Sequence, residues 1–290
     1  MAWKTGEGST GRLLELSFGY FVFYVITGIM VKYFTGGLMQ PPMAQMTYLF
    51  NNTLGGAAIA LAVVVALGWV RLQSNQQIRW AGLTFPVEYR YIIPSGVCTA
   101  IVIPTTTLMY TLPISVLVAM VIMRGSVIVI SRVVDSVQIR QGILKKKVYA
   151  AENWGVVFAI LAVATNVLLI PIVTFLDAKG IPASRSVGLS GHSMKGSFDF
   201  LGNAAAMAIM GMYIVAYSIR IYIMNYYKNT RAKGVPQDNK GFFAIEQIAA
   251  CVTMVLAAAI FYFGPFNPAD VRIADFRAAI NNPDGLAILS

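Results

Sequence analysis

Seven segments of this chain are each long and apolar enough to cross a lipid bilayer. A span of the hydrocarbon core needs about 20 predominantly apolar residues, and all seven reach that length. The strands of a membrane barrel would be about half as long and would alternate in polarity, which these segments do not. The predicted fold class is all-α, a polytopic membrane helix bundle with spans over residues 13–34, 46–72, 91–110, 114–134, 154–176, 198–227 and 242–263.

The basic residues predict the orientation of this bundle. The net charge is +10, and the charges lie between the apolar blocks. If the N-terminus is cytoplasmic, fifteen Lys and Arg, Arg220 among them, fall on the inner side and six on the outer side. This bias follows the positive-inside rule, so we expect an N-in, multi-pass protein and no nucleic-acid partner. The Lys run at 145–147 could also contact anionic head groups. A plasma or bacterial inner membrane is the default localisation.

One arginine, Arg124, lies at the centre of the fourth segment. A cation at bilayer mid-depth costs about 2.5–3.5 kcal/mol on insertion scales, and this position is too deep for the side chain to reach an interface. The guanidinium offers a planar fork for phosphate or carboxylate, so Arg124 is the candidate anchor for an anionic solute. The alternative is a structural pair with Glu246, with Glu15 or with backbone carbonyls.

Other polar residues within the spans are weaker candidates. Glu246 and Gln247, near the inner end of the seventh segment, are a candidate coupling or gating pair, although a carboxylate near an interface can simply be hydrated. Possible cavity-lining residues that would contact a solute are Tyr110, Asn51, Asn52 and Asn166. Hydrogen bonds to a neighbouring helix are the commoner use of such groups.

Enzyme signatures are missing from the sequence. The single histidine, His192, lies in the long outer loop, and no phosphate-binding glycine loop or pair of intramembrane aspartates is present. Both cysteines, Cys98 and Cys251, lie within spans, which argues against a disulfide framework or a zinc site. We therefore expect no enzyme activity, no metal and no cofactor.

A weak internal repeat surrounds the long outer loop. Gly19 and Gly28 in the first segment have the same spacing as Gly202 and Gly211 in the sixth. Because five spans separate the copies, the second copy would be inverted in the membrane, as in many transporters. The chain then divides into a first five-helix repeat at 1–176, an external loop at 177–197 and an incomplete second repeat at 198–290.

Pro94 and Pro104 predict a kinked or partly broken third helix.

The region 107–168 resembles the fourth-to-fifth helix region of the drug/metabolite transporter superfamily. The likeness rests on Met123-Arg124-Gly125 in the fourth segment, on the basic stretch at 140–147 and on Asn153-Trp154-Gly155 at the start of the fifth segment. It is closest to the nucleotide-sugar-transporter-like branch. The resemblance implies ten helices in two inverted five-helix repeats, a central cavity near Arg124, and alternating access. This chain departs from that pattern because it offers seven spans, and its last six residues read as the first turn of an eighth. We expect the sequence to continue in a longer protein.

These observations favour a transporter of an organic metabolite, such as a nucleotide sugar, as the predicted function. The expected partners are a small organic solute and the lipid bilayer, with a homodimer as an open alternative. The rival function is a non-transport protein, either a seven-helix receptor or an assembly scaffold.

Overall fold

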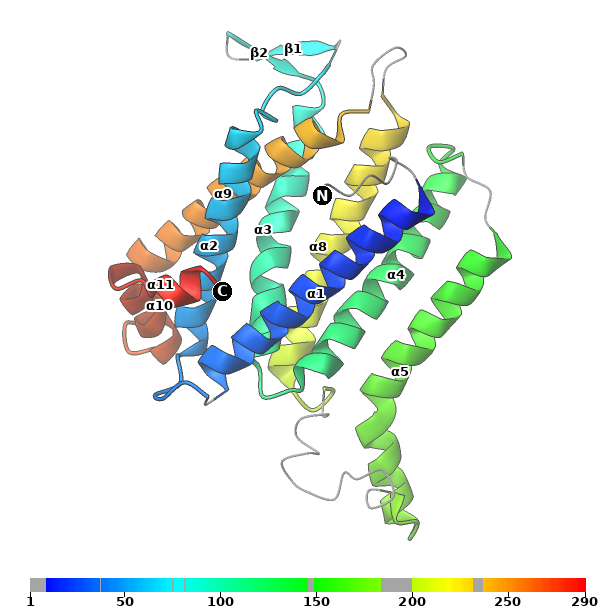
Figure 1. Cartoon of the computed structure of the whole chain (residues 1–290), viewed down its shortest axis with the longest axis vertical. Coiled ribbons are helices and arrows are strands. Elements are labelled where there is room, and N and C mark those ends of the chain that lie inside the picture. The colour runs from blue at the N-terminus through cyan, green and yellow to red at the C-terminus, as the bar shows by residue number, and fades with distance from the viewer. Residues whose placement is uncertain are drawn as a thin grey trace.

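The computed structural model describes residues 9–36, 38–74, 76–80, 82–145, 149–183, 200–231 and 237–290. Within these ranges, seven helices are long and apolar enough to cross a membrane. This confirms the predicted membrane helix bundle and makes the chain an integral multi-pass protein (Figure 1). The seven are α1 (Thr10–Thr35), α2 (Gln45–Ala66), α3 (Tyr89–Thr111), α4 (Val116–Arg140), α5 (Ala150–Ala178), α8 (Ala204–Asn229) and α9 (Asn239–Phe263).

Short polar side chains begin several of these helices. Ser9 accepts a hydrogen bond from the Arg12 amide at the start of α1. Asn203 and Asp238 cap α8 and α9 in the same way. Such caps satisfy backbone N–H groups that have no partner inside the helix. The chain therefore marks these helix starts locally, although the apolar run decides that each helix exists.

Helix α3 is the centre of the bundle. It packs against α8 and α9, and also contacts α1, α2 and α4. In its most apolar stretch 56% of the residues are buried, against 11% in α1 and α5. Helix α5 packs on α4 at one side of the bundle and extends beyond its neighbours at one end (Figure 1). The contacts between the helices therefore centre on α3.

Two glycines allow close contacts between neighbouring helices. A Cβ atom added at Gly96 of α3 would lie 2.7 Å from the Glu246 carbonyl oxygen of α9. One added at Gly125 of α4 would collide with the Val163 side chain of α5. Small residues at such crossings let helix backbones approach closely in a membrane. Gly125 directly follows Arg124, so two neighbouring residues supply a half-buried cation and a close helix contact.

These elements differ from the sequence-based expectations in some places. Helix α3 continues as one helix through Pro94 and Pro104, so it is not broken there, and the predicted kink stays a prediction. Nearby Thr105 and Thr106 donate hydrogen bonds to its backbone carbonyls. Helix α2 ends at Ala66, well before 72, and Gly68 follows it with φ +64°. The chain then forms an unpredicted antiparallel hairpin, β1 (Gln77–Trp80) and β2 (Leu83–Pro86). Its register pairs Ile78 with Phe85.

The polar stretch after α9 is more ordered than its composition suggests. It contains α10 (Val271–Asn281), which packs on α2 and α9, and α11 (Gly285–Ile288), which packs on α2. The backbone amide of Asp284 donates to the Asn51 side chain at 3.2 Å. The last residues, predicted as the first turn of an eighth span, thus lie beside α2 as the short α11. The ten-helix architecture and the inverted repeat stay predictions.

The repeat glycines have unlike surroundings. Gly28 packs closely on Met120 of α4, whereas Gly19 and Gly211 have open space beside them. Gly202 precedes α8. The predicted outer loop at 177–197, with His192, lies mostly outside the described residues, and α5 runs to Ala178.

Candidate functional site

Arg124 lies in α4, on the helix that the sequence singles out. Helix α4 extends to Arg140 rather than ending at 134. Arg124 is therefore in the half of α4 nearer the α3–α4 connection, and not at the helix centre as predicted. It is still well inside the apolar part of a helix that can cross the membrane. The side chain is half-buried, and it has to find its partners within the bundle.

Those partners are aromatic rings of α1. The Arg124 guanidinium carbon lies 4.1 Å from the centre of the Tyr24 ring and 5.5 Å from that of Tyr20. The two rings are stacked, 5.5 Å apart. A cation over an aromatic face is stabilised by about 0.5–2 kcal/mol, the more so when water is excluded. This contact joins α1 to α4 and offsets part of the cost of placing the arginine in the membrane.

Tyr110 of α3 belongs to the same group. Its hydroxyl is hydrogen-bonded to that of Tyr24, the two rings meet edge to face, and Tyr110 is 1% exposed. Tyr110 and Arg124, each predicted to contact a solute, therefore lie in one group of side chains, and their solute-binding roles stay predictions.

Two tyrosines of α8 complete what we call the tyrosine cluster, which consists of Tyr20, Tyr24, Tyr110, Tyr213 and Tyr217. The rings of Tyr213 and Tyr217 are 5.2 Å apart. Tyr213 is buried and lies within electrostatic range of Arg124. Tyr217 lies within range of Tyr20. Three helices, α1, α3 and α8, thus carry these phenol groups, and four of the five lie close enough to Arg124 to interact with its charge.

Arg124 has no anionic partner among the residues that the structure describes. Its Nε atom is buried and makes no hydrogen bond, and no described carboxylate lies within ion-pair distance of it. Glu246, one of the two carboxylates predicted as a possible partner, is bonded to Arg220 instead. The structural alternative of an Arg124–Glu246 pair is therefore wrong.

Glu246 is the centre of a second polar site, on the α3, α8 and α9 side of the bundle. It is 1% exposed. Its carboxylate accepts two hydrogen bonds from Arg220, from Nε at 2.9 Å and from Nη2 at 2.8 Å. The Ser95 hydroxyl donates a third at 2.6 Å. A bidentate, charge-assisted pair of this kind is the strong form of an ion pair. The expectation that Glu246 is simply hydrated near an interface is wrong.

Arg220 therefore lies in the bundle and not in an inner loop. It is part of α8 and its side chain is 22% exposed. Removing it from the inner-loop count leaves fourteen of the fifteen cations there against six outside, so the charge bias persists. Gln247, predicted to act with Glu246, is 8% exposed on the same helix, and no described hydrogen bond joins it to the pair.

The three candidate asparagines lie elsewhere. Asn51 is fully buried and bonds the Thr47 carbonyl as well as the C-terminal segment. The Asn52 side chain accepts a hydrogen bond from Thr107 of α3 at 3.2 Å. Asn166 donates to the Ala162 carbonyl of its own helix. No described hydrogen bond joins any of the three to the tyrosine cluster, and their solute-binding roles stay predictions.

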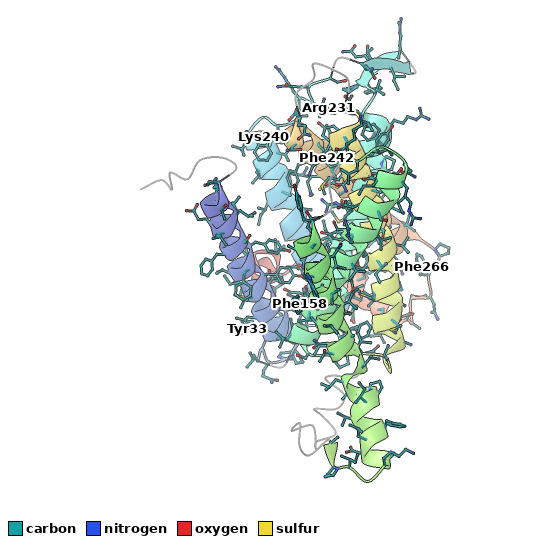
Figure 2. All side chains as sticks on the ribbon, turned by 90° about the vertical axis from the view of Figure 1, so that its right-hand side faces the viewer. Tyr33, Phe158, Arg231, Lys240, Phe242 and Phe266 are labelled. Carbon is teal, nitrogen blue, oxygen red and sulfur yellow. The ribbon has the colours of Figure 1, made fainter. Side chains whose placement is uncertain are left out.

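A third cluster closes the end of the bundle where the β-hairpin lies (Figures 1 and 2). Arg231 donates to the Tyr227 hydroxyl at 2.7 Å and to the Gln73 carbonyl, and lies 3.5 Å from Glu88. The Tyr227 hydroxyl donates to the Asp238 carbonyl at 2.8 Å. Figure 2 shows Arg231, Lys240 and Phe242 grouped at this end. These bonds tie α8 to α9 and to the starts of α3 and the hairpin, and we interpret them as structural.

Sequence reasoning missed Tyr20, Tyr24, Arg220 and Ser95. The sequence holds a signal for three of them, Tyr20, Tyr24 and Arg220. Tyr20 and Tyr24 are one helical turn apart, which places both on one face of the first span. Arg220 lies inside the apolar segment 198–227, and a second intramembrane arginine beside one intramembrane glutamate suggests a pair.

No protein-family model, no curated protein and no solved structure matches this chain. The resemblance to the drug/metabolite transporter superfamily therefore stays a hypothesis that rests on the sequence motifs.

Proposed function

We propose that this protein is a membrane transporter that moves an organic anion, such as a nucleotide sugar, by alternating access, and that Arg124 binds the anionic group of the solute. The single observation that carries the proposal is a half-buried intramembrane guanidinium with no carboxylate partner among the described residues.

The tyrosine cluster supports an anion site in particular. The guanidinium carbon lies over the rings of Tyr20 and Tyr24, whereas phosphate and carboxylate bind the N–H edge of a guanidinium in its plane. A solute anion could therefore bind without displacing the rings. Phenol hydroxyls near the cation, such as that of Tyr213, are additional donors to solute oxygens.

The Glu246–Arg220 pair is the candidate coupling or gating element of the transporter. It joins α8 to α9 and α3 through hydrogen bonds from Arg220 and Ser95. A buried pair with two discrete states, made and broken, is suited to control access to one end of a cavity. The N-in orientation, with this pair toward the cytoplasm, is part of the same proposal.

The alternative is a non-transport receptor or scaffold, in which Arg124 holds α1 against α4. The tight packing of Gly28 on Met120, in the same α1–α4 contact, is the observation that favours it. In that case Arg124 would stabilise the fold but would not bind a solute.

Binding to the purified protein in proteoliposomes tests the proposal. Radiolabelled UDP-glucose, a sugar phosphate and a dicarboxylate are the first probes. We expect Arg124→Ala to abolish saturable binding of the recognised probe, because both the charge and the donors are lost. Arg124→Lys should weaken it at least tenfold, because a lysine cannot form the bidentate fork.

The matched control is Arg79→Lys in the β1–β2 hairpin, which keeps the fold and should bind as the wild type does. If both Arg124 variants bound the probe with unchanged affinity, Arg124 would not be the anion anchor.

A further inference from the structure

One face of α8 connects the tyrosine cluster with the Glu246–Arg220 pair. Tyr213, Tyr217 and Arg220 recur at intervals of about one helical turn, which places them on the same side of α8. Tyr213 lies within electrostatic range of Arg124. The Tyr217 ring lies 5.2 Å from that of Tyr213 and 5.9 Å from the guanidinium carbon of Arg220. We call Arg124, Tyr213, Tyr217 and Arg220 the polar row, and an arginine stands at each of its ends.

The two ends of the polar row lie at different depths in the bundle. From Tyr213 to Arg220 the helix rises about 10 Å. Arg124 is in the half of α4 nearer the α3–α4 connection, whereas Arg220 is in the half of α8 nearer the β-hairpin (Figure 1). In the proposed N-in orientation, Arg124 is therefore toward the outside and Arg220 toward the cytoplasm.

The charges at the two ends do not balance. The guanidiniums carry two positive charges, and Glu246 supplies one negative charge. Its carboxylate bonds only Nε and Nη2 of Arg220, so Nη1 lies outside the bidentate bond. The Arg220 side chain is 22% exposed, and none of its nitrogens is among the enclosed atoms without a partner. One positive charge is therefore left over for a solute anion.

Glu246 occupies Arg220 in the way that a solute anion would. Its carboxylate makes the bidentate bond with the guanidinium that phosphate and carboxylate ligands also make. The Ser95 hydroxyl donates to the same carboxylate at 2.6 Å, so Glu246 keeps one donor when Arg220 is taken from it. A carboxylate of the chain and an anionic group of the solute thus compete for one guanidinium.

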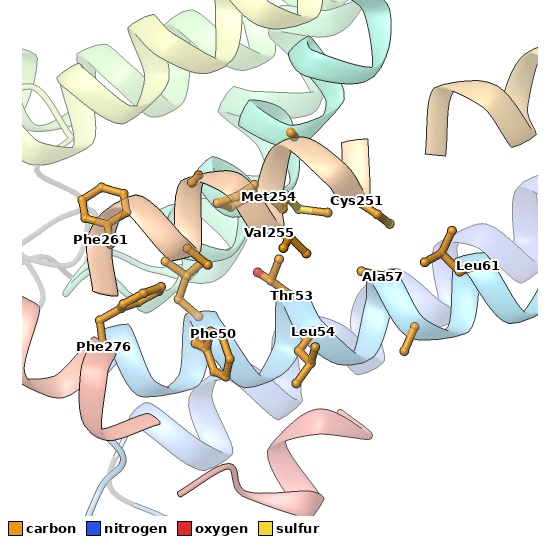
Figure 3. A pocket seen from close by; sticks show the side chains of 16 residues that line it. Phe50, Thr53, Leu54, Ala57, Leu61, Cys251, Met254, Val255, Phe261 and Phe276 are labelled. Carbon is orange, nitrogen blue, oxygen red and sulfur yellow. The ribbon is translucent and has the colours of Figure 1, made fainter. Parts of the chain in front are cut away.

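An apolar groove elsewhere in the bundle offers the anion nothing comparable. It lies between α2 and α9, and apolar side chains line nearly all of it (Figure 3). No charged residue is among those that line it. An anion would lose its hydration there without gaining a partner, so a second site for the anion needs a cation such as Arg220.

We infer that Arg220 is a second binding residue for the solute anion, and that Glu246 is the internal anion that occupies it in the absence of solute. The solute passes from Arg124 along the two phenol groups of α8 to Arg220. There it displaces the Glu246 carboxylate, which stays bonded to Ser95. The inference rests on the proposed transport function and gives the Glu246–Arg220 pair a chemical role, which is to keep the inner site closed until an anion arrives.

Removal of the Glu246 charge tests this inference in proteoliposomes that contain the purified full chain. The labelled probe is the one among UDP-glucose, a sugar phosphate and a dicarboxylate that the wild type binds. Arg124→Ala alone should abolish its saturable binding, because Glu246 still occupies Arg220. Arg124→Ala combined with Glu246→Gln should bind the probe at least about tenfold more tightly than Arg124→Ala does, the worth of one charge-assisted hydrogen bond, because a neutral amide competes poorly for the guanidinium.

Three comparisons make the result specific. Adding Arg220→Met to the double variant should remove the regained binding. Glu152→Gln, which removes a negative charge from α5 instead, is the matched control and should leave Arg124→Ala without binding. The single variant Glu246→Gln should bind the probe at least as tightly as the wild type, which shows that the fold accepts the amide.

The failure of this inference differs from the failure of the proposed function. If the double variant regains no binding, or if the regained binding survives Arg220→Met, the inference is overturned and Arg124 stays the anion anchor. Unchanged binding in Arg124→Ala alone would overturn the proposed function, and this inference with it.

Discussion

The Glu246–Arg220 pair makes a quantitative prediction about stability. Glu246 is 1% exposed and accepts three hydrogen bonds, two from Arg220 and one from Ser95. Replacing it by alanine leaves a guanidinium inside the bundle without its anion. Breaking a buried pair in this way costs about 3–5 kcal/mol. Because the Arg220 side chain keeps 22% of its exposure and can recover some solvation, we expect the lower end, about 3 kcal/mol.

Two further variants separate the pair from simple packing. Glu246→Gln keeps the shape and an acceptor oxygen, and should cost about 1.5 kcal/mol. The double variant Arg220→Met with Glu246→Leu removes both charges together. It should lie within about 1 kcal/mol of the wild type, because exchanging a buried pair for apolar side chains is often neutral. Arg272→Met, at an exposed arginine of α10, is the control for loss of one positive charge and should be neutral.

The measurement is unfolding of the purified protein in mixed lipid–detergent micelles by titration with sodium dodecyl sulfate, followed by far-ultraviolet circular dichroism. The quantity compared is the free energy of unfolding of each variant. Measured with the single variants Arg220→Met and Glu246→Leu, the double variant completes a double-mutant cycle, which isolates the interaction between the two side chains. If Glu246→Ala lost less than about 1 kcal/mol, or if the double variant lost the sum of the two single losses, the pair would not stabilise the bundle as argued.

Three further predictions concern α1 and the orientation of the chain. Gly28→Val should cost about 1 kcal/mol in unfolding free energy, because its Cβ would lie 2.7 Å from the mobile Met120 methyl and 3.1 Å from the stiffer Val116 side chain, whereas Gly19→Val, with nothing within 4 Å, should be neutral. Tyr24→Phe should lower the unfolding free energy by about 1 kcal/mol, because the hydrogen bond of the hydroxyl is lost. Tyr24→Leu should lower it by about 1 kcal/mol more, because the ring over the guanidinium is also lost. Equal losses for the two variants in the same titration would show that this ring does not stabilise the bundle. In a background without the native cysteines, Arg79→Cys should react with an impermeant maleimide only from the cytoplasmic side and Arg272→Cys only from the outside; the reverse pattern would contradict the N-in orientation.

The sequence predicted what the bilayer itself dictates. A span must be about 20 apolar residues long and must satisfy its backbone hydrogen bonds internally. The composition alone therefore identifies seven helices, and the structure confirms them. The sequence determines the ends of the helices less well. Helix α2 ends at Ala66 because Gly68 adopts a left-handed conformation, although the apolar run of the sequence continues past it.

The sites depended on which helix faces meet, and a single sequence does not contain that information. Arg124 stood out because its depth is costly wherever it points. Its aromatic partners on α1 and the bond from Arg220 to Glu246 require the packing of α4 and α8 beside α3. The hairpin at 77–86 was missed because it is short and lies outside the spans. The helix α10 was missed because its residues show little amphipathic pattern.

Solute counterflow tests the central claim most directly. Sealed proteoliposomes are loaded with the unlabelled probe that binds in an Arg124-dependent way, and the labelled probe is added outside. A transporter predicts transient accumulation of label above the external concentration, which Arg124→Ala abolishes and Arg79→Lys leaves unchanged. A probe that binds through Arg124 but never enters the vesicles would contradict transport and would favour the receptor or scaffold.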